Sequence, residues 1–336
     1  MRLLVCGGAG FIGSNYVRRR LAERPGDEIR VLDKLTYAGR RENLEAVGGE
    51  QLELIEGDIC DREAVGAAAD GCEAIVNFAA ESHVDRSITS PGEFIVTDVF
   101  GTHVLLEAAR DLGIRHLQIS TDEVYGSIEE GSFTESSPLD PSSPYSASKA
   151  GGDLIVSAFR HTYGVDSLVI RASNNYGPCQ HPEKLIPLVI LNALHGDAIP
   201  VYGDGLQVRN WLFVEDFCSA IDLVLERGAA GEAYNVGGPD ELANIDVVER
   251  VLDLTGRDSS LIEHVGDRPG HDRRYSLASE KLIALGWRAQ VPFAEGIERT
   301  VAWYRDNERW WGPLRSGEYR AYYEHQYGRS LGQKTD

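Results

Sequence analysis

The stretch VCGGAGFIG, residues 5–13, decides the fold that we expect for this 336-residue chain. Its four glycines stand between an apolar run at 2–6, which predicts a strand, and a helical pattern at 11–24. Because glycine has no Cβ, the chain can turn tightly here, and its backbone can approach a pyrophosphate at the start of the helix. The stretch therefore predicts a dinucleotide-binding βα unit. The alternative is a glycine turn that is only structural.

Short apolar runs alternate with longer amphipathic segments through the first half of the chain. We expect strands at 2–6, 28–33, 52–58, 74–80, 115–121 and 166–172, and helices at 11–24, 61–70, 90–111 and 144–163. Strands that are apolar on both faces and separated by helices indicate a parallel sheet covered on both sides. The expected fold is therefore α/β, a Rossmann-type doubly wound parallel sheet with a smaller, mixed α/β substrate-binding domain. The expected domains are 1–172 plus about 210–237, and about 173–209 plus 238–330.

Composition and charge disfavour several classes of protein. The apolar fraction of 42% and the charged fraction of 26% are ordinary for a globular protein, and no run is long enough to span a bilayer. The five cysteines are scattered without a CxxC pair, so we expect neither disulfides nor a metal site, and a cytoplasmic location. A net charge of −20 argues against nucleic acid and anionic membranes as partners. An anionic small molecule requires positive side chains gathered locally.

Asp33 ends the second expected strand, and its position indicates which dinucleotide binds. Its carboxylate can accept both hydroxyls of an adenosine ribose. It would repel the 2′-phosphate of NADP by about 4 kcal/mol per unit charge at an effective dielectric near 20. NAD is therefore the expected cofactor, although Lys34 beside it tempers the argument. Asp58 and Ile59, after the third strand, would suit the adenine edge.

Tyr145 and Lys149 stand four residues apart at the start of an expected helix and so lie on one face. A tyrosine normally ionises at about pH 10. A cation four residues away, together with a positively charged nicotinamide ring, would favour the phenolate and lower the pKa of Tyr145. The tyrosine could then take a proton from a sugar hydroxyl. The alternative is a solvated helix face, on which this spacing occurs by chance.

These two motifs in this order resemble the extended short-chain dehydrogenase/reductase superfamily. Five further stretches are similar to dTDP-glucose 4,6-dehydratases: AAESHVDRSI (79–88), STDEVYG (120–126), RASNNYGP (171–178), PEKLIP (182–187) and DRPGH (267–271). The resemblance runs from residue 1 to about 311. Its discriminating part is the Thr-Asp-Glu triplet at 121–123.

The resemblance implies a reaction that uses both carboxyl groups of the triplet. After Tyr145 and NAD oxidise C4 of dTDP-glucose, the C5 hydrogen becomes acidic and Glu123 can remove it. Asp122 can protonate the departing C6 hydroxyl, and Thr121 can hydrogen-bond the C4 oxygen. Hydride returned to C6 gives dTDP-4-keto-6-deoxyglucose, a product suited to deoxysugar biosynthesis. Neighbouring carboxyl groups suit opposite protonation states because the charge of one raises the pKa of the other.

The geometry of the triplet makes a local prediction. In a regular strand, Asp122 and Glu123 would point to opposite faces. Both can reach one sugar only if the chain leaves extended geometry there, so we predict that the strand ends at about Ser120 or Thr121. The alternative is an acidic loop in solvent.

The motifs and the resemblance together assign residues to the two ligands. Those assigned to NAD are Gly7, Gly10, Phe11, Ile12, Gly13, Asp33, Lys34, Leu35, Thr36, Asp58, Ile59, Phe78, Ala79, Ala80, Ser82, Thr97, Tyr145, Lys149 and Asn175. Those assigned to the sugar nucleotide are Ser82, Thr121, Asn174, Lys184, Leu185, Pro200, Tyr202, Arg209, Asn244, Arg268 and His271. The basic members supply positive charge for a diphosphate, and the planar fork of arginine can bond two oxygens at once.

Two alternative functions stay open. The nearest is another sugar-nucleotide enzyme of the superfamily, a UDP-hexose 4-epimerase or a UDP-glucuronate decarboxylase; an epimerase needs no acid at C6, so Asp122 disfavours it. The other is a non-catalytic dinucleotide-binding regulator, which the intact catalytic set argues against. The resemblance also implies a homodimer formed through helices that include the Tyr145 helix. We expect the aromatic residues at 303–327 to be packing surface and His83 to be structural. Thymine and uracil nucleotides are not distinguished.

Overall fold

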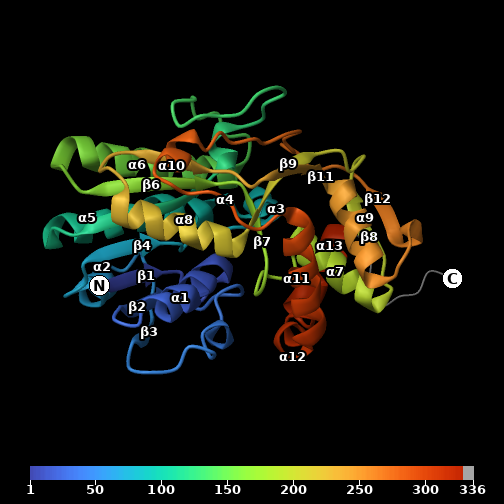
Figure 1. Ribbon diagram of the computed structural model, residues 1–336, viewed down its shortest axis with the longest axis horizontal. Coiled ribbons are helices and arrows are strands. Elements are labelled where there is room, and N and C mark those ends of the chain that lie inside the picture. The colour runs from blue at the N-terminus through green and yellow to red at the C-terminus, as the bar shows by residue number, and fades with distance from the viewer. Residues whose placement is uncertain (328–336) are drawn as a thin grey trace.

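The computed structural model describes residues 1–327, and a seven-stranded sheet forms the centre of this part of the chain (Figure 1). Its strand order is β10-β6-β5-β4-β1-β2-β3, and every pairing is parallel. The expected Rossmann-type sheet is confirmed. Its strands are β1 (Arg2–Cys6), β2 (Glu28–Asp33), β3 (Leu52–Glu56), β4 (Ala74–Asn77), β5 (Arg115–Thr121), β6 (Ser167–Ala172) and β10 (Ala233–Val236).

Helices cover both faces of this sheet, which is why its strands are apolar on both sides. Leu3 and Val5 of β1 pack in the cluster formed with α1 (Phe11–Glu23) and α8 (Val214–Arg227). Leu4 and Cys6 belong to the opposite cluster. The helices on that side are α2 (Arg62–Ala69), α5 (Thr102–Leu112) and α6 (Pro144–Tyr163). Consecutive residues of one strand thus stabilise two different helical layers.

The second half of the chain adds smaller elements, most of which lie beside the large sheet, at the right of Figure 1, whereas α10 lies at the left with the large sheet. One small sheet joins β7 (Asn174–Tyr176), β9 (Val208–Phe213) and β11 (Asp240–Ala243), and another joins β8 (Ile199–Tyr202) and β12 (Ile262–Val265). The helices are α7 (Leu185–His195), α9 (Asn244–Thr255), α10 (Glu280–Ala284), α11 (Phe293–Asp306), α12 (Glu308–Trp311) and α13 (Glu318–Tyr327). Most of these elements share a separate apolar cluster. The exact domain boundaries stay a prediction.

Two expected strands end two or three residues earlier than predicted. The strand expected at 74–80 ends at Asn77, whose side-chain oxygen accepts from the Ala79 N–H at 3.1 Å and replaces a ladder bond. The strand expected at 52–58 ends at Glu56.

The helix expected at 90–111 is divided into three segments. These are α4 (Pro91–Phe94), a π-helical segment η2 (Ile95–Gly101) and α5. In η2 the Asp98 carbonyl accepts from the Thr102 hydroxyl at 2.6 Å, a side-chain contact that competes with the regular helical ladder.

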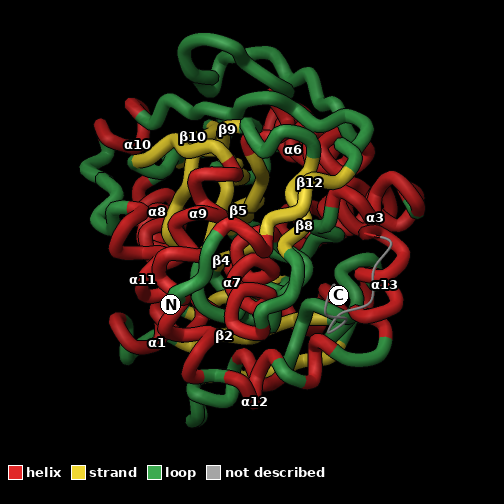
Figure 2. The backbone as a smooth tube through the Cα atoms, turned by 90° about the vertical axis from the view of Figure 1, so that its right-hand side faces the viewer, coloured by secondary structure: helices red, strands yellow, loops and turns green. Residues whose placement is uncertain are grey.

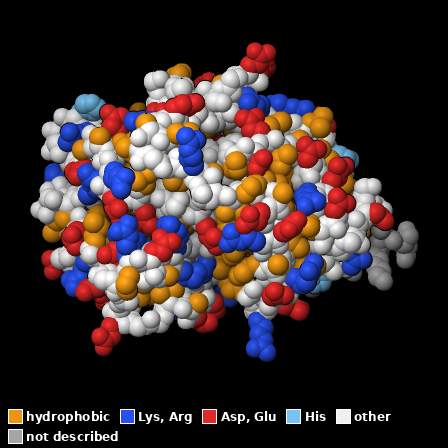
Figure 3. All heavy atoms as spheres, in the orientation of Figure 1, with side chains coloured by type: hydrophobic (Ala, Val, Ile, Leu, Met, Phe, Trp, Pro, Cys, Tyr) orange, Lys and Arg blue, Asp and Glu red, His pale blue; other side chains and the backbone are white. Residues whose placement is uncertain are grey.

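The surface carries charges of both signs. Figure 3 shows acidic and basic side chains mixed over the face in view, without a continuous basic area there. Among residues 1–327, no helix combines the length and the apolar character that a membrane crossing requires.

Candidate active site

The glycine loop and the start of α1 form one wall of a cleft at the carboxyl edge of the large sheet. Gly7 has a φ of 71°, and a Cβ there would lie 2.5 Å from the backbone nitrogen of Ala79. Among the described residues, no side chain caps α1, which begins at Phe11. Its first N–H groups are therefore available to a diphosphate at the positive end of the helix dipole. This cradle fits the pyrophosphate of a dinucleotide.

Asp33 stands beside this loop at the end of β2. Its carboxylate accepts from the N–H groups of Ala9 and Leu35, each at 2.9 Å, and burial raises its pKa against the effect of these two bonds. Each carboxylate oxygen keeps a further lone pair that a ribose hydroxyl can use. The Leu35 side chain packs against the apolar cluster that includes residues of α1 and does not line the cleft, and its assignment to NAD stays a prediction. Leu35 also has a φ of 52°, which sequence patterns did not indicate.

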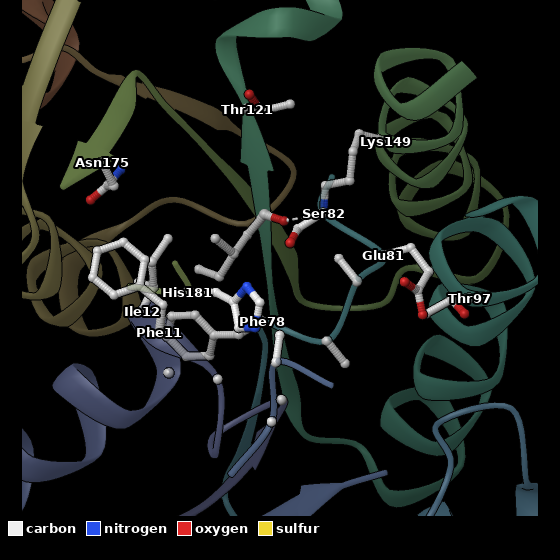
Figure 4. Close-up of a pocket in the computed structure, with 18 of the residues that line it drawn as sticks. Phe11, Ile12, Phe78, Glu81, Ser82, Thr97, Thr121, Lys149, Asn175 and His181 are labelled. Atoms are coloured by element: carbon white, nitrogen blue, oxygen red, sulfur yellow. Dashed lines mark hydrogen bonds between the residues drawn. The ribbon is translucent and has the colours of Figure 1, made fainter. Parts of the chain in front are cut away.

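The other residues assigned to the dinucleotide all line this cleft, whose volume is about 310 Å³. Figure 4 shows Phe11, Ile12 and Phe78 on one side and Glu81 with Thr97 on the other. The Lys34 ammonium contacts the Asp58 carboxylate at 2.8 Å. Because this pair occupies Lys34, the lysine is a poorer partner for a 2′-phosphate than the sequence alone suggested.

The chain leaves extended geometry directly after Thr121, as predicted. β5 ends at Thr121, and Asp122–Tyr125 forms a 3₁₀ turn, η3. Thr121 caps this turn, because its hydroxyl oxygen accepts from the Glu123 N–H at 3.3 Å. Its hydroxyl also lies 3.2 Å from Oδ1 of Asp122 and donates to it. As a result, both carboxyl groups line the same cleft.

Burial favours the neutral form of both carboxyl groups, but nearby charges separate them. Asp122 is 1% exposed, and burial followed by the charge of Glu123 raises its pKa to about 8. Its Oδ2 has no hydrogen-bond partner among residues 1–327. Burial also raises the pKa of Glu123, while the positive charges of Arg268, Arg209 and Lys184 oppose this rise. The arrangement favours a protonated Asp122 beside an ionised Glu123 at neutral pH.

Tyr145 and Lys149 reach the cleft from the first turns of α6, which Ser143 caps. Figure 4 shows Lys149 extending from this helix toward the cleft. Its ammonium donates to the Ile119 carbonyl in β5 at 2.8 Å. The prediction that this lysine and a bound nicotinamide ring together lower the pKa of Tyr145 stays a prediction for the complex with NAD, and the net effect of the chain's own groups is in the opposite direction. Burial, followed by the negative charge of Glu123, raises that pKa well above its ordinary value.

A second cavity, of about 180 Å³, adjoins the first. Four residues line both: Glu123, Asn174, Glu183 and Lys184. The wall of the second cavity carries the remaining residues assigned to the sugar nucleotide, which are Leu185, Pro200, Tyr202, Arg209, Asn244, Arg268 and His271. Ser82 and Thr121 line the first cavity. Glu123 therefore stands where the two cavities meet, and Asp122 beside it lines the first cavity.

Backbone and carboxylate oxygens hold the basic side chains of this junction in place. Arg209 donates to the carbonyls of Val208 at 2.8 Å and Asp272 at 2.9 Å. Arg268 donates to Asp85 at 3.2 Å, and Lys184 donates to a backbone carbonyl in the 79–88 segment. These contacts leave further donors of each group for a diphosphate.

Sequence reasoning missed three buried carboxylates that hold side chains in and beside the site. Glu183 is 4% exposed and pairs with Arg86, and Asp85 accepts from both Arg268 and the Tyr202 hydroxyl. Asp98 accepts from the hydroxyl of Ser148, next to Lys149, at 2.6 Å. The first two lie inside motifs already noted, at 79–88 and 182–187, where an acid stands beside a basic residue. Their partners, however, lie far away in the sequence.

The aromatic segment mostly packs, as expected. Tyr304, Trp311, Tyr319 and Tyr323 are buried in the apolar cluster of the second half. Tyr327 also packs against this cluster, and in addition it lines the second cavity. Among the described residues, no group of three or more His, Cys, Asp or Glu side chains could hold a metal ion.

His83 also lines the second cavity. Burial lowers its pKa to about 4, so the imidazole is neutral near pH 7. Its ring packs edge-on against Tyr322 with ring centres 5.5 Å apart.

Comparisons with known proteins place these features in a family. The family model described as GDP-mannose 4,6 dehydratase matches residues 4–300. The dTDP-glucose 4,6-dehydratase of Streptomyces niveus is 51% identical over 324 residues, which cover 94% of this chain and 96% of that protein. The crystal structure of the dTDP-glucose 4,6-dehydratase DesIV from Streptomyces venezuelae, with NAD bound, has a TM-score of 0.92 at 54% identity and covers 94% of this chain and 100% of that chain. The UDP-glucose 4-epimerase of Thermus thermophilus, also in complex with NAD, has a TM-score of 0.85 at 33% identity and covers 91% of this chain and 100% of that chain.

The raised pKa of Asp122 predicts how stability depends on pH. A carboxyl group whose folded pKa of about 8 exceeds its ordinary value of 3.8 stabilises the fold fully below the ordinary value, and this contribution is lost as the pH rises through about 8. We expect the free energy of unfolding to fall between about pH 6 and pH 9, and to fall less in Asp122→Asn, because an amide does not ionise. Urea unfolding at both pH values measures this. Asp70→Asn, at an exposed carboxylate, is the control; equal pH dependence in the native chain and Asp122→Asn would contradict the raised pKa.

Proposed function

Because this chain belongs to the dTDP-glucose 4,6-dehydratases, we propose that Tyr145, Glu123 and Asp122 perform the proton transfers of that reaction. The enzyme is a hydro-lyase that uses NAD and converts dTDP-glucose to dTDP-4-keto-6-deoxyglucose. One observation supports the division of roles above all others. Two adjacent carboxyl groups line one cleft with different surroundings: burial dominates at Asp122, and three cations oppose the effect of burial at Glu123.

The first proton transfer takes place at the C4 hydroxyl of the glucose. When bound, NAD accepts hydride from C4 and later returns it to C6, and the positive charge of its oxidised ring favours a phenolate at Tyr145. Tyr145 takes the hydroxyl proton, and Lys149, fixed by the Ile119 carbonyl, supplies a nearby positive charge. Thr121 hydrogen-bonds the C4 oxygen and polarises the new ketone. The polarised ketone acidifies the hydrogen on C5.

The next transfers remove water across C5 and C6. Glu123, kept ionised by the cations of the junction, takes the C5 proton. Asp122, kept protonated by burial and by the charge of Glu123, donates its proton to the C6 hydroxyl, which leaves as water. Lys184, Arg209 and Arg268 stand beside this point and bind the diphosphate. After hydride transfer to C6, Glu123 would give a proton back to C5 and so return to its carboxylate form.

We also propose that two copies of the chain pair through η2 and α6, which pack against each other. Ile95, Val96 and Phe100 on η2 and Leu154 on α6 are between 44% and 61% exposed. Apolar side chains gathered on two adjacent helical segments fit an isologous interface with a second copy.

A cytoplasmic location is proposed from the cysteines. All five, which lie within the described residues, are free thiols, and four of them are buried. Free thiols of this kind suit a reducing compartment.

Mass spectrometry of the product tests the reaction. With dTDP-glucose and UDP-glucose offered side by side, we expect the dTDP sugar to be converted faster to a product lighter by the mass of one water. An unchanged mass with both substrates would contradict a dehydratase and favour an epimerase.

Asp122→Asn tests the proposed acid. We expect this variant to reduce its bound NAD when dTDP-glucose is added, because C4 oxidation does not use Asp122. Loss of water should slow by about 10²- to 10⁴-fold, the usual contribution of a positioned acid. Absorbance of NADH follows the first step and product mass the second. Unchanged turnover would remove Asp122 from this role.

Glu123→Gln tests the proposed base. We expect it to abolish incorporation of solvent deuterium at C5, since an amide cannot accept the proton. Deuterium content is read from the mass of recovered sugar nucleotide. The matched control is Glu130→Gln, an exposed glutamate a few residues away, which should exchange like the native chain. Full exchange in Glu123→Gln would assign the base elsewhere.

Leu154→Asp tests the proposed dimer. A charge in the middle of an apolar interface is costly to bury, so we expect this variant to elute as a monomer. Light scattering after size-exclusion chromatography measures the mass. Ile283→Asp, at an apolar residue of α10 that is 38% exposed, should leave the dimer intact. A native chain that is monomeric would contradict the pairing.

A further inference from the structure

The start of helix α3 (Val84–Thr89) lies between the two cavities and beside the C-terminal helix, and Figure 2 shows α13 next to α3. Arg86 is on this helix. Its guanidinium lies 4.0 Å from the ring centre of Tyr37 and 5.1 Å from that of Tyr322. Its Nε also donates to the buried carboxylate of Glu183 at 3.2 Å. One side chain thus contacts three segments that are distant in the sequence.

Each of these segments belongs to a cavity wall. Tyr37 lies within the loop at 34–39, of which Lys34, Thr36, Ala38 and Gly39 line the dinucleotide cleft. Glu183 lines both cavities and is followed by Lys184, which also lines both. Tyr322 is on α13, whose last residue, Tyr327, lines the second cavity. Arg86 therefore joins a loop of the first cavity, the shared wall and a helix of the second.

Arg86 balances the charge of Glu183, a residue that lines both cavities, so the position of Arg86 affects the wall that the cavities share. Burial lowers the pKa of both His83 and His181 to about 4, so neither imidazole carries a positive charge at neutral pH. The standing positive charges near Glu183 are then Lys184 and Arg86. If Arg86 moved away, Lys184 would be the remaining cation for a buried carboxylate, and it would be less available to the substrate.

The residue before Arg86 extends this arrangement into the second cavity. Asp85 accepts from Arg268 at 3.2 Å and from the Tyr202 hydroxyl at 2.9 Å, and both of these residues line the second cavity. The Tyr322 hydroxyl also donates to Asp85, at 3.4 Å. A shift of α3 would therefore move the groups that face the nucleotide as well as those that face the dinucleotide.

We infer that Arg86 is a positioning residue that couples the two cavities, so that NAD in the first strengthens binding of the nucleotide diphosphate in the second, and the reverse. This inference rests on the proposed function of the two cavities. The planar guanidinium can stack between two rings while its Nε bonds a carboxylate, which a lysine ammonium cannot do. Coupling between two ligands is reciprocal, and its usual size is about 5- to 150-fold in affinity.

The test is a binding cycle with thymidine diphosphate and NAD, measured by titration calorimetry on the full chain. In the native chain we expect saturating NAD to tighten thymidine diphosphate at least about fivefold. The ratio that measures coupling is the Kd of thymidine diphosphate without NAD divided by its Kd with saturating NAD. In Arg86→Met this ratio should fall toward one, and Arg86→Lys should give an intermediate value. A role in structure alone would weaken both ligands and leave the ratio unchanged, and that result would overturn the inference.

Two further variants keep the test decisive. Arg299→Met is the matched control, because Arg299 also lies over an aromatic ring, that of Phe213 at 4.5 Å, and pairs with Glu215, yet it lines neither cavity. Its ratio should equal that of the native chain. If Arg86→Met does not fold, Tyr322→Leu should lower the ratio while Tyr322→Phe, which keeps the ring, should preserve it. Equal ratios in these two variants would overturn the inference.

Failure of this inference is distinguishable from failure of the proposed function. Turnover of dTDP-glucose by the native chain is measured separately and decides the function. A native chain that dehydrates dTDP-glucose but binds thymidine diphosphate equally well with and without NAD would reject the coupling alone.

Discussion

Two adjacent carboxyl groups enter the cleft from the end of β5, and their repulsion in a place with little water determines what the surrounding residues must do. Two unit charges in contact repel by about 4 kcal/mol at an effective dielectric of 20. The electrostatic free energy of the pair is lowest when one of the two carboxyl groups keeps its proton. Both groups belong to the η3 turn, in which Asp122 is 1% exposed. Three cations, Arg268, Arg209 and Lys184, favour the charge on Glu123, whereas among the described residues Arg209 is the one cation that opposes the effect of burial on Asp122. The proton is therefore favoured on Asp122.

The same constraint explains how an acidic chain can hold an anionic substrate. The net charge is −20, yet three cations converge where the two cavities meet. Their own partners are mostly carbonyls, which fix a cation without neutralising it, as for Arg209 with Val208 and Asp272. Where a carboxylate does take part, as Asp85 does with Arg268, it also holds a second group of the wall. Positive potential at the junction therefore survives in spite of the overall charge.

The sequence predicted those parts of the site whose causes are local. The glycine loop, the end of β5 and the spacing of Tyr145 and Lys149 each depend on a few consecutive residues, and each lies where it was expected. The direction of the Tyr145 pKa depends on burial and on Glu123, which come from other elements. The roles of Glu183 and Asp85 depend on partners that the fold brings close, Arg86 and Arg268 among them. Likewise, no sequence pattern indicated the inward packing of Leu35 or the π-helical segment at Ile95–Gly101.

A shared fold does not decide which reaction such a site performs. The epimerase of Thermus thermophilus matches this chain with a TM-score of 0.85. The large sheet and its dinucleotide cleft therefore do not distinguish the two reactions. What dehydration adds is a proton donor at C6, and a carboxyl group can donate near neutral pH only if its pKa is raised. In this chain the largest cause of that rise is burial of Asp122, not the identity of the residue. A variant that kept Asp122 and Glu123 but let water reach the η3 turn would therefore lower the pKa of Asp122, and the acid that we propose for C6 would be ionised at neutral pH.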